Sequence, residues 1–277
     1  MLARRLGVAL AAPSLIAIGL LAGSLLASGG VSSRPLAAKQ RATADAGVLS
    51  GDYPRVPPSR STEASVVANV EGSRAIVYRS PTERRAWRRY ANPTSRRTPL
   101  VFLVRRRVGS WLRVLLPSRP NGSEGWLRAA RAELRTNPYS VLVNLREHDI
   151  VVRRAGRTLL SAAVGVGRAA TPTPTGLYYV TELLRQPNPN GLYGPWAFAL
   201  SAHSSVLTYF GGGDGQVGIH GTNEPSGIGH TVSHGCIRVR NSVIEKLAAI
   251  LPLGTPVRIV AQGQVSSQNR NSRLSQS

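Results

Sequence analysis

The sequence predicts a mainly β protein made of two folded units, with one helix near the C-terminal end of the second unit. Between residues 64 and 260, short apolar runs rich in Val, Ile, Leu and Tyr recur about every ten residues. Gly, Pro, Asn and Ser separate these runs, which is the pattern of short strands joined by turns. The stretch from 241 to 251 instead repeats its apolar side chains at helical spacing. We therefore expect a small β-barrel followed by a larger all-β domain.

The first unit spans residues 64–132 and is strongly basic. Asn121-Gly122 is a strong turn signal, and a strand is expected to resume at Gly125. Together with Trp111 and Trp126, this spacing resembles the SH3-like modules with which bacterial proteins bind cell walls. The expected strands are 66–70, 75–78, 100–104, 111–115 and 125–127.

The second unit spans residues 138–260 and is interpreted as a series of strands, one helix and a final strand. Ser242 and Glu245 have the spacing of a capping box at the start of the helix. The loop 185–195 has a length that is often found in functional covers. The expected strands are 140–145, 150–152, 159–166, 177–180, 197–202, 218–220 and 256–260. The expected buried stripe of the helix is Ile244, Leu247, Ala248 and Leu251.

The N-terminal segment, residues 1–27, predicts export. Arg4 and Arg5 precede 22 uncharged residues, 6–27, which are enough to cross a hydrocarbon core of roughly 30 Å. The arginines are expected to stay in the cytoplasm, which places the rest of the chain outside, in the cell wall or a periplasm-like space. An uncleaved membrane anchor is favoured over a cleaved signal peptide, because the run is long and ends in a poor cleavage site. Residues 28–63 are interpreted as a flexible linker and residues 261–277 as a disordered tail.

The charge of the chain is concentrated in the first unit. The formal net charge is +22, from 35 basic and 13 acidic residues. Residues 64–130 hold 14 arginines and three glutamates, a net charge of +11. A basic patch outside a cell predicts a polyanionic partner, so we expect this unit to bind anionic cell-wall material. Nucleic acid is the general interpretation of such charge, and export argues against it.

Cys236 is the only cysteine of the chain, so it cannot form an internal disulfide. A catalytic thiol needs a base that takes its proton and donors that hold an oxyanion. His220 ends a strand-like run, and His234 lies two residues before the cysteine. The residues alone leave both histidines as candidate bases.

A metal site is the competing interpretation of the same segment. His220, His230, His234 and Cys236 are all residue types that ligate zinc, and His203 is a further candidate. Their spacing is not a familiar zinc pattern. We therefore expect neither a metal nor a cofactor, and the roles of His203 and His230 stay open.

Two motifs of the second unit resemble the L,D-transpeptidase catalytic domain of the YkuD type. They are Ile219-His220-Gly221-Thr222 and Ser233-His234-Gly235-Cys236-Ile237-Arg238. Thr173-Pro174-Thr175-Gly176 and Gly254-Thr255-Pro256-Val257 agree with the same family. The resemblance covers residues 138–260 and implies an all-β catalytic fold.

The resemblance also implies a role for each motif residue. Cys236 would be the nucleophile and His220 its base, with the imidazole oriented by the backbone carbonyl of Gly221. Backbone N–H groups of Gly235 and Cys236 would form the oxyanion hole. The residues expected to bind substrate or support the site are Ser233, His234, Arg238, Tyr193 and Trp196. Arg238 would hold an acidic group of the substrate or shape the motif loop, and the aromatic pair would shape a loop that covers the substrate.

The reaction implied by the family is a two-step acyl transfer on peptidoglycan stem peptides. Cys236 would attack the L,D bond before the terminal D-alanine of a tetrapeptide, and an amine of another stem would resolve the thioester into a 3→3 crosslink. An L,D-carboxypeptidase or a D-amino acid exchange enzyme would use the same site. A non-catalytic wall-binding protein, acting through the basic unit, is the alternative of another class.

Overall fold

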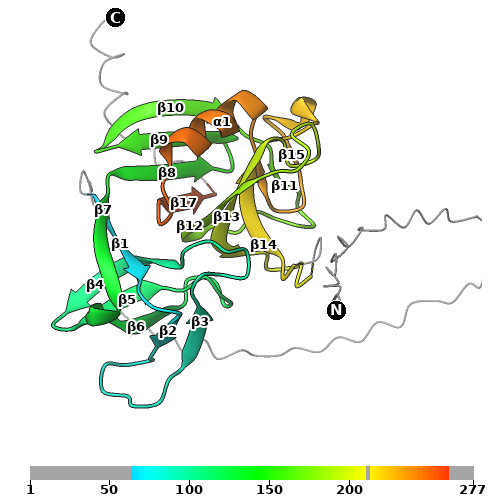
Figure 1. Ribbon diagram of the computed structural model, residues 1–277. Helices are drawn as coiled ribbons and strands as arrows, with labels where there is room; N and C mark the ends of the chain where they lie inside the picture. The colour runs from blue at the N-terminus through cyan, green and yellow to red at the C-terminus, as the bar shows by residue number, and fades with distance from the viewer. Residues whose placement is uncertain (1–63, 210–212, 262–277) are drawn as a thin grey trace, which may run out of the picture. The chain divides into compact units, whose positions relative to one another are not determined.

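The computed structural model describes residues 64–209 and 213–261, which are mainly β with one α-helix (Figure 1). The expected export segment 1–27, the linker 28–63 and the tail after residue 261 lie outside these residues. Within the described ranges, no helix is long and apolar enough to cross a membrane.

The first module, residues 64–137, contains a five-stranded antiparallel sheet in the order β6-β5-β4-β1-β7. A two-stranded hairpin joins it through the bridge between Tyr78 and Trp126. The strands of the sheet are β1 (Ser65–Val70), β4 (Val101–Val108), β5 (Trp111–Leu115), β6 (Glu124–Arg128) and β7 (Ala132–Asn137). The hairpin is formed by β2 (Arg74–Val77) and β3 (Arg88–Ala91).

Two strands of this module are absent from the sequence prediction. β3 alternates half-buried and exposed residues, and its sequence begins with two arginines. β7 pairs with β1 along its whole length and carries the sheet past the expected boundary at residue 132. Both are polar strands with little buried surface, so their apolar alternation is too weak to mark them in the sequence.

The second module, residues 138–261, has an eight-stranded sheet in the order β10-β9-β8-β17-β12-β13-β14-β16. β17 pairs with β8 in parallel and β14 pairs with β16 in parallel, while the other neighbours are antiparallel. The strands are β8 (Tyr139–Asn144), β9 (Asp149–Arg154), β10 (Arg157–Ala163), β12 (Gly176–Arg185), β13 (Trp196–His203), β14 (Gln216–His220), β16 (Ile237–Arg238) and β17 (Pro256–Val260). A separate parallel pair is formed by β11 (Val166–Gly167) and β15 (Thr231–Ser233).

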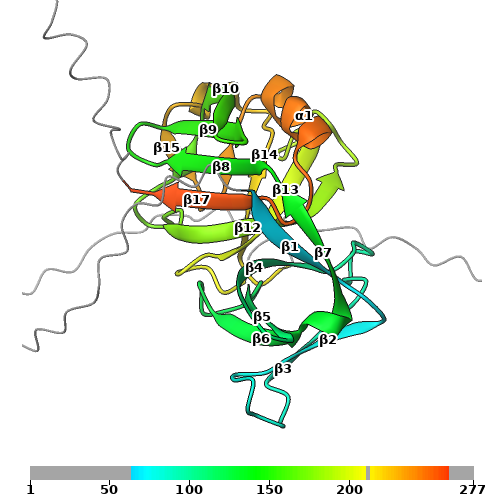
Figure 2. The ribbon, with the colours of Figure 1, turned by 90° about the vertical axis from the view of Figure 1, so that its left-hand side faces the viewer.

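The helix α1 (Asn241–Ile250) packs against β13 and β14 (Figure 2). Ile244 and Leu247 are fully buried in the core of the module, as the helical spacing predicts. The predicted capping box at Ser242 and Glu245 is wrong, because the N-cap residue is Arg240 and no side chain caps the helix. The side chain of Asn241 accepts a hydrogen bond from the backbone N–H of Thr222 at 2.8 Å instead. The start of α1 is therefore attached to the segment that follows β14.

An apolar contact connects the two modules. Tyr179 of β12 is fully buried and packs with Val67, Val101, Leu103 and Leu115 of the first module. Burial of these side chains provides a hydrophobic contribution to the association of the modules.

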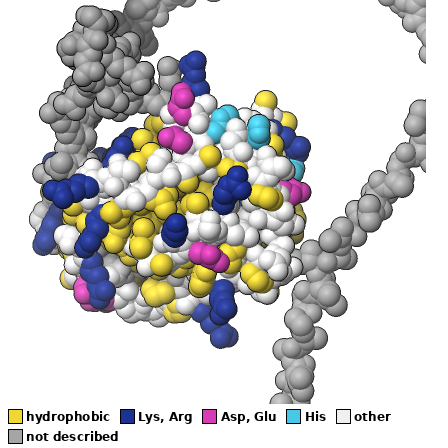
Figure 3. Space-filling view, turned by 90° about the horizontal axis from the view of Figure 1, so that it is seen from above, with side chains coloured by type: hydrophobic (Ala, Val, Ile, Leu, Met, Phe, Trp, Pro, Cys, Tyr) yellow, Lys and Arg dark blue, Asp and Glu magenta, His cyan; other side chains and the backbone are white. Residues whose placement is uncertain are grey.

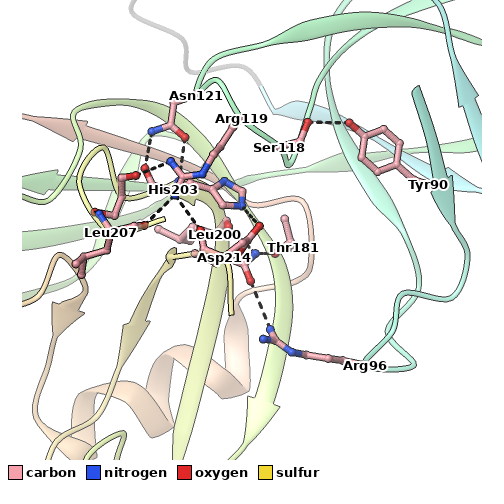
Figure 4. A network of polar contacts seen from close by, with 12 residues as sticks. Tyr90, Arg96, Ser118, Arg119, Asn121, Thr181, Leu200, His203, Leu207 and Asp214 are labelled. Atoms are coloured by element: carbon pink, nitrogen blue, oxygen red, sulfur yellow. Dashed lines mark hydrogen bonds and ion pairs between the residues drawn. The ribbon is translucent and has the colours of Figure 1, made fainter. Parts of the chain in front are cut away.

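A network of polar contacts also connects the two modules (Figure 4). The guanidinium of Arg119 donates to the backbone carbonyls of Ser204 at 2.6 Å, Leu207 at 3.0 Å and Asp214 at 2.8 Å. Asn121 exchanges two hydrogen bonds with the backbone of His203, at 2.7 and 2.9 Å. The turn between β5 and β6 thus holds both ends of the connection between β13 and β14.

Candidate active site

The site is built where two strands meet in parallel. His220 ends β14, and Cys236 comes directly before β16. Ile219 pairs with Ile237 and His220 with Arg238, and the N–H of Val239 donates to the carbonyl of His220 at 2.9 Å. Backbone pairing therefore brings together two motifs that lie sixteen residues apart in the sequence.

The imidazole of His220 is oriented by the backbone. Its Nδ1 lies 2.6 Å from the carbonyl oxygen of Gly221, which can only accept a hydrogen bond. The proton of a neutral imidazole is therefore assigned to Nδ1, which leaves Nε2 as the acceptor. This is the contact that the family resemblance implies for Gly221.

Close packing fixes the segment around this carbonyl. A Cβ on Gly221 would collide with Oδ1 of Asn241 and would lie 3.0 Å from Cα of Gly194. Gly194 itself has φ +62°, a left-handed conformation that favours glycine. The neighbouring ring of Tyr193 meets the imidazole of His220 edge to face, with centroids 4.8 Å apart. The long loop before β13 is therefore seated on the histidine.

The turn before Cys236 is held by Ser233. Its hydroxyl donates to the carbonyl of Cys236 at 2.6 Å and accepts from the N–H of Gly235 at 3.1 Å. Gly235 has φ +115°, which is outside the ordinary range of residues with a side chain. The carbonyl of Ser233 accepts in turn from the hydroxyl of Thr171 at 3.2 Å and from the N–H of Arg168 at 3.0 Å.

The electrostatics of the site favour an uncharged thiol and imidazole. Burial is the main cause that lowers the pKa of His220 to about 4; the hydrogen bond with the Gly221 carbonyl opposes this shift, and the nearby guanidinium of Arg238 adds a smaller lowering effect. Burial raises the pKa of the Cys236 thiol above its usual value, against smaller opposing effects of the Gly218 backbone and Arg238. Arg238 therefore favours the thiolate over the imidazolium, while burial keeps both groups neutral at rest.

Arg238 is buried and paired. Its Nη1 lies 2.8 Å from Oε2 of Glu224, whose side chain is largely exposed. Backbone N–H and carbonyl of Arg238 also bond to Gly165, at 2.8 and 2.9 Å. These contacts attach the side chain and backbone of Arg238 to the segments around Glu224 and Gly165. No local sequence signal marks Glu224 as its partner.

The other predicted residues surround this centre. His234 is exposed, and its Nε2 lies 2.6 Å from Nη2 of Arg168, a residue that the sequence analysis did not select. Burial lowers the pKa of His234, and the charge of Arg168 adds a smaller lowering effect. Trp196 is half-buried at the start of β13, and its carbonyl accepts from the N–H of Gly221 at 3.3 Å.

His203 does not join this centre. It is buried at the module junction, where Nε2 lies 3.0 Å from Oδ2 of Asp214. The described residues contain no group of three or more His, Cys, Asp or Glu side chains placed to hold a metal ion.

Comparison with known proteins assigns the second module. The family model of the L,D-transpeptidase catalytic domain matches residues 138–259. The putative L,D-transpeptidase YkuD of Bacillus subtilis is 36% identical over 124 residues, which cover 45% of this chain and 67% of that protein. The putative L,D-transpeptidase YqjB of the same organism is 31% identical over 134 residues, which cover 44% of this chain and 71% of that protein.

Solved structures are also similar to parts of the chain. A structure from Bdellovibrio bacteriovorus has 27% sequence identity and a TM-score of 0.38, and the match covers 50% of this chain and about half of that one, 54%. The catalytic domain of the Enterococcus faecium L,D-transpeptidase has 25% identity and a TM-score of 0.33, and the match covers 44% of this chain and 96% of that domain. Because these TM-scores lie below 0.5, the assignment depends on the sequence matches. The family model starts at residue 138, so the SH3-like kinship of the first module stays a prediction. By its sequence relatives, the chain belongs to the L,D-transpeptidase catalytic domain family.

Proposed function

We propose that the protein is an extracytoplasmic L,D-transpeptidase of peptidoglycan that uses Cys236 as its nucleophile. The observation that carries the proposal is the pairing of β14 with β16, which sets the Cys236 turn beside an imidazole whose Nδ1 is engaged by the Gly221 carbonyl. A fixed Nδ1–H leaves Nε2 as the atom that accepts the thiol proton. Family membership supports stem peptides as the substrate class.

The first half of the reaction is acylation. As Nε2 of His220 takes the thiol proton, the sulfur of Cys236 attacks the carbonyl carbon of the L,D peptide bond. The tetrahedral intermediate then collapses, the bond to the terminal D-alanine breaks, and the imidazolium returns the proton to the leaving amine. A thioester and free D-alanine are formed, with no net change in protons.

Because Cys236 and His220 are both neutral before the reaction, we infer that the thiol proton is transferred during the attack on the substrate. A preformed thiolate–imidazolium pair is disfavoured by burial, which shifts the pKa of both groups away from it. Proton transfer therefore accompanies attack, in the manner of general-base catalysis. Arg238 contributes by favouring negative charge on sulfur, from a position fixed by Glu224.

The oxyanion that forms during attack needs N–H donors. Within the described part of the chain, the backbone N–H of Cys236 donates no hydrogen bond, whereas the backbone N–H of Gly235 donates to the hydroxyl of Ser233. We assign Cys236 N–H as the first donor. Gly235 would serve only after its N–H leaves the Ser233 hydroxyl.

The second half of the reaction resolves the thioester. Attack by an amine of another stem would form a 3→3 crosslink, attack by water would make the protein an L,D-carboxypeptidase, and attack by a free D-amino acid would exchange the terminal residue. Tyr193 and Trp196, at the end of the loop that packs on His220, are proposed to shape a loop that covers the substrate.

The basic first module is proposed to keep the enzyme on anionic cell-wall material, and residues 6–27 to hold it at the membrane if they are not cleaved. The charge contrast supports this division. On the face seen in Figure 3, basic side chains lie among hydrophobic, acidic and uncharged ones, whereas residues 64–130 hold 14 arginines against three glutamates. The alternative, wall binding without catalysis, predicts wall retention with no turnover.

Product analysis tests the proposal. Purified protein is incubated with a tetrapeptide donor, with and without a second stem that carries a free amine, and the products are separated and weighed. We expect D-alanine release and a 3→3 dimer when the amine is present. Tripeptide alone in both reactions would assign the carboxypeptidase, and the absence of any D-alanine release would contradict enzymatic function.

A further inference from the structure

The hairpin of β2 and β3 projects from the sheet of the first module (Figures 1 and 2). Arginine side chains surround Trp87, which lies between these two strands. Residues 74–89 contain six arginines and one glutamate. Across the described ranges 64–209 and 213–261, none of these six arginines pairs with a carboxylate. Positive charge is therefore concentrated here without the acidic partners that neutralise other arginines of the molecule.

Trp87 is a fixed platform within this charge. Its backbone N–H donates to the carbonyl of Val77 at 2.8 Å, and its ring packs on the core of the first module. Gly125 of β6 lies against it, since an added Cβ there would be 3.4 Å from Cζ3 of the ring and would collide with Val77. Contacts with the strands of the first module therefore fix the position of the Trp87 ring.

Two guanidinium groups lie over this ring. The Cζ atoms of Arg79 and Arg88 are 4.7 and 4.9 Å from the ring centroid of Trp87. Arg88 is held further by a hydrogen bond from Nη2 to the carbonyl of Arg119 at 2.9 Å. A guanidinium held over an aromatic face is pre-organised, and its planar fork of N–H donors matches the oxygens of phosphate and carboxylate. The guanidinium N–H groups over Trp87 are therefore positioned to donate hydrogen bonds to a bound phosphate or carboxylate.

A pocket of about 300 Å³ opens beside the stack. It is lined by Arg79, Glu83, Arg85, Ala86 and Trp87. Its single carboxylate, Glu83, is outnumbered by the two lining arginines and by Arg88 over the same ring. We call Arg79, Arg85, Trp87 and Arg88 the arginine–tryptophan cluster.

We propose that the arginine–tryptophan cluster binds the phosphodiester groups of an anionic envelope polymer. The inference deepens the proposed function, because it rests on the assignment of the first module to anionic wall material. A phosphodiester chain carries one uncompensated negative charge per repeat and presents two oxygens to a guanidinium fork. Bases of a nucleic acid would need the ring surface over which the two guanidinium groups lie.

Binding of full-length protein to a synthetic poly(glycerol phosphate) tests the proposal. Arg79→Gln/Arg85→Gln removes two lining charges, and Arg106→Gln/Arg107→Gln removes two exposed charges of β4 as the matched control. We expect the cluster variant to lose roughly tenfold in affinity or more, from the loss of charge-assisted hydrogen bonds, and the control variant to lose less than about threefold. The affinity of the cluster variant should also depend less steeply on salt concentration than that of the wild-type protein.

Three results would overturn the proposal. Equal losses in the two variants would show diffuse charge instead of a site. Tighter binding to duplex DNA of matched charge, lost in the cluster variant, would assign the site to nucleic acid. Equal binding to peptidoglycan freed of phosphate, lost in the same variant, would assign it to stem carboxylates. Turnover of the soluble tetrapeptide donor is measured in parallel and should stay at the wild-type level, so that failure of this site is distinguished from failure of the enzyme assignment.

Discussion

Nδ1 of His220 lies 2.6 Å from the carbonyl oxygen of Gly221, the residue that follows it in the chain. A backbone acceptor thus takes the place of the acidic side chain that orients the histidine in a Ser-His-Asp triad. It fixes the tautomer without adding a negative charge, so burial can lower the pKa of His220 to about 4. The orientation of the proposed base therefore depends on local backbone packing, which mutation can disturb.

Gly221→Ala is expected to disturb it directly. The new Cβ would overlap Oδ1 of Asn241 and lie 3.0 Å from the backbone Cα of Gly194, so we expect the segment that carries the orienting carbonyl to shift. Misplacement of a catalytic group by about 1 Å can cost on the order of a hundredfold, and we expect a loss of that order in the acylation rate. Gly109→Ala is the control, because φ +54° makes it strained while nothing lies within 4 Å. An unchanged acylation rate in Gly221→Ala would contradict the role of the carbonyl.

His220 should also make stability depend on pH. Its pKa is about 4 in the folded state and near 6.5 when unfolded, so the unfolded chain binds the proton first as the pH falls. The free energy of unfolding is therefore not reduced by this group above pH 6.5, and it falls as the pH decreases from 6.5 to about 4. A difference of this size corresponds to on the order of 3 kcal/mol. Urea unfolding at several pH values should show a flatter profile for His220→Gln, and identical profiles would contradict burial of a neutral imidazole.

Burial of His220 should set the acid limit of acylation, and Arg238 should shift that limit by a smaller amount. Its charge lowers the pKa of His220 and also that of Cys236. In Arg238→Gln, the pKa of His220 rises, so the base becomes protonated at a higher pH and the acid limb of the rate profile moves upward. Arg238→Lys retains the charge and should keep the limb close to the wild-type position. If both variants lose rate equally at every pH, Arg238 acts through structure alone.

The junction between the modules should depend on Arg119. Arg119→Ala removes three hydrogen bonds to the connection between β13 and β14. Because these are charge-assisted bonds at a partly buried site, we expect a loss of about 2–4 kcal/mol in the free energy of unfolding. Arg113→Ala removes an exposed ion pair with Glu124 and should cost less than about 1 kcal/mol. Equal losses, measured by chemical denaturation, would show that the junction adds little.

The sequence predicts those parts of the fold that alternate apolar and polar residues. β5 was expected at 111–115 and β17 at 256–260, and the structure has both with those bounds. β15 and β16 have three and two residues, too few for a period to appear. The capping box was wrong because the helix begins at Asn241 with Arg240 as its N-cap, and the bond between Asn241 and Thr222 is a tertiary contact that local spacing does not report.

The proposed catalytic pair was visible in the sequence because its motifs are contiguous. The partners of that pair were not. Glu224 reaches Arg238 and Arg168 reaches His234 only after the strands have paired, across 14 and 66 positions. Such contacts are set by the sheet register, so a single sequence carries no local signal for them.

Intact mass after incubation with a tetrapeptide donor tests the central claim most directly. The proposed mechanism predicts that the wild-type protein gains the mass of the tripeptide acyl group, that Cys236→Ala gains none, and that His220→Gln acylates far more slowly at neutral pH. An acyl adduct of the same mass on Cys236→Ala, or full turnover by that variant, would contradict the assignment of Cys236 as the nucleophile.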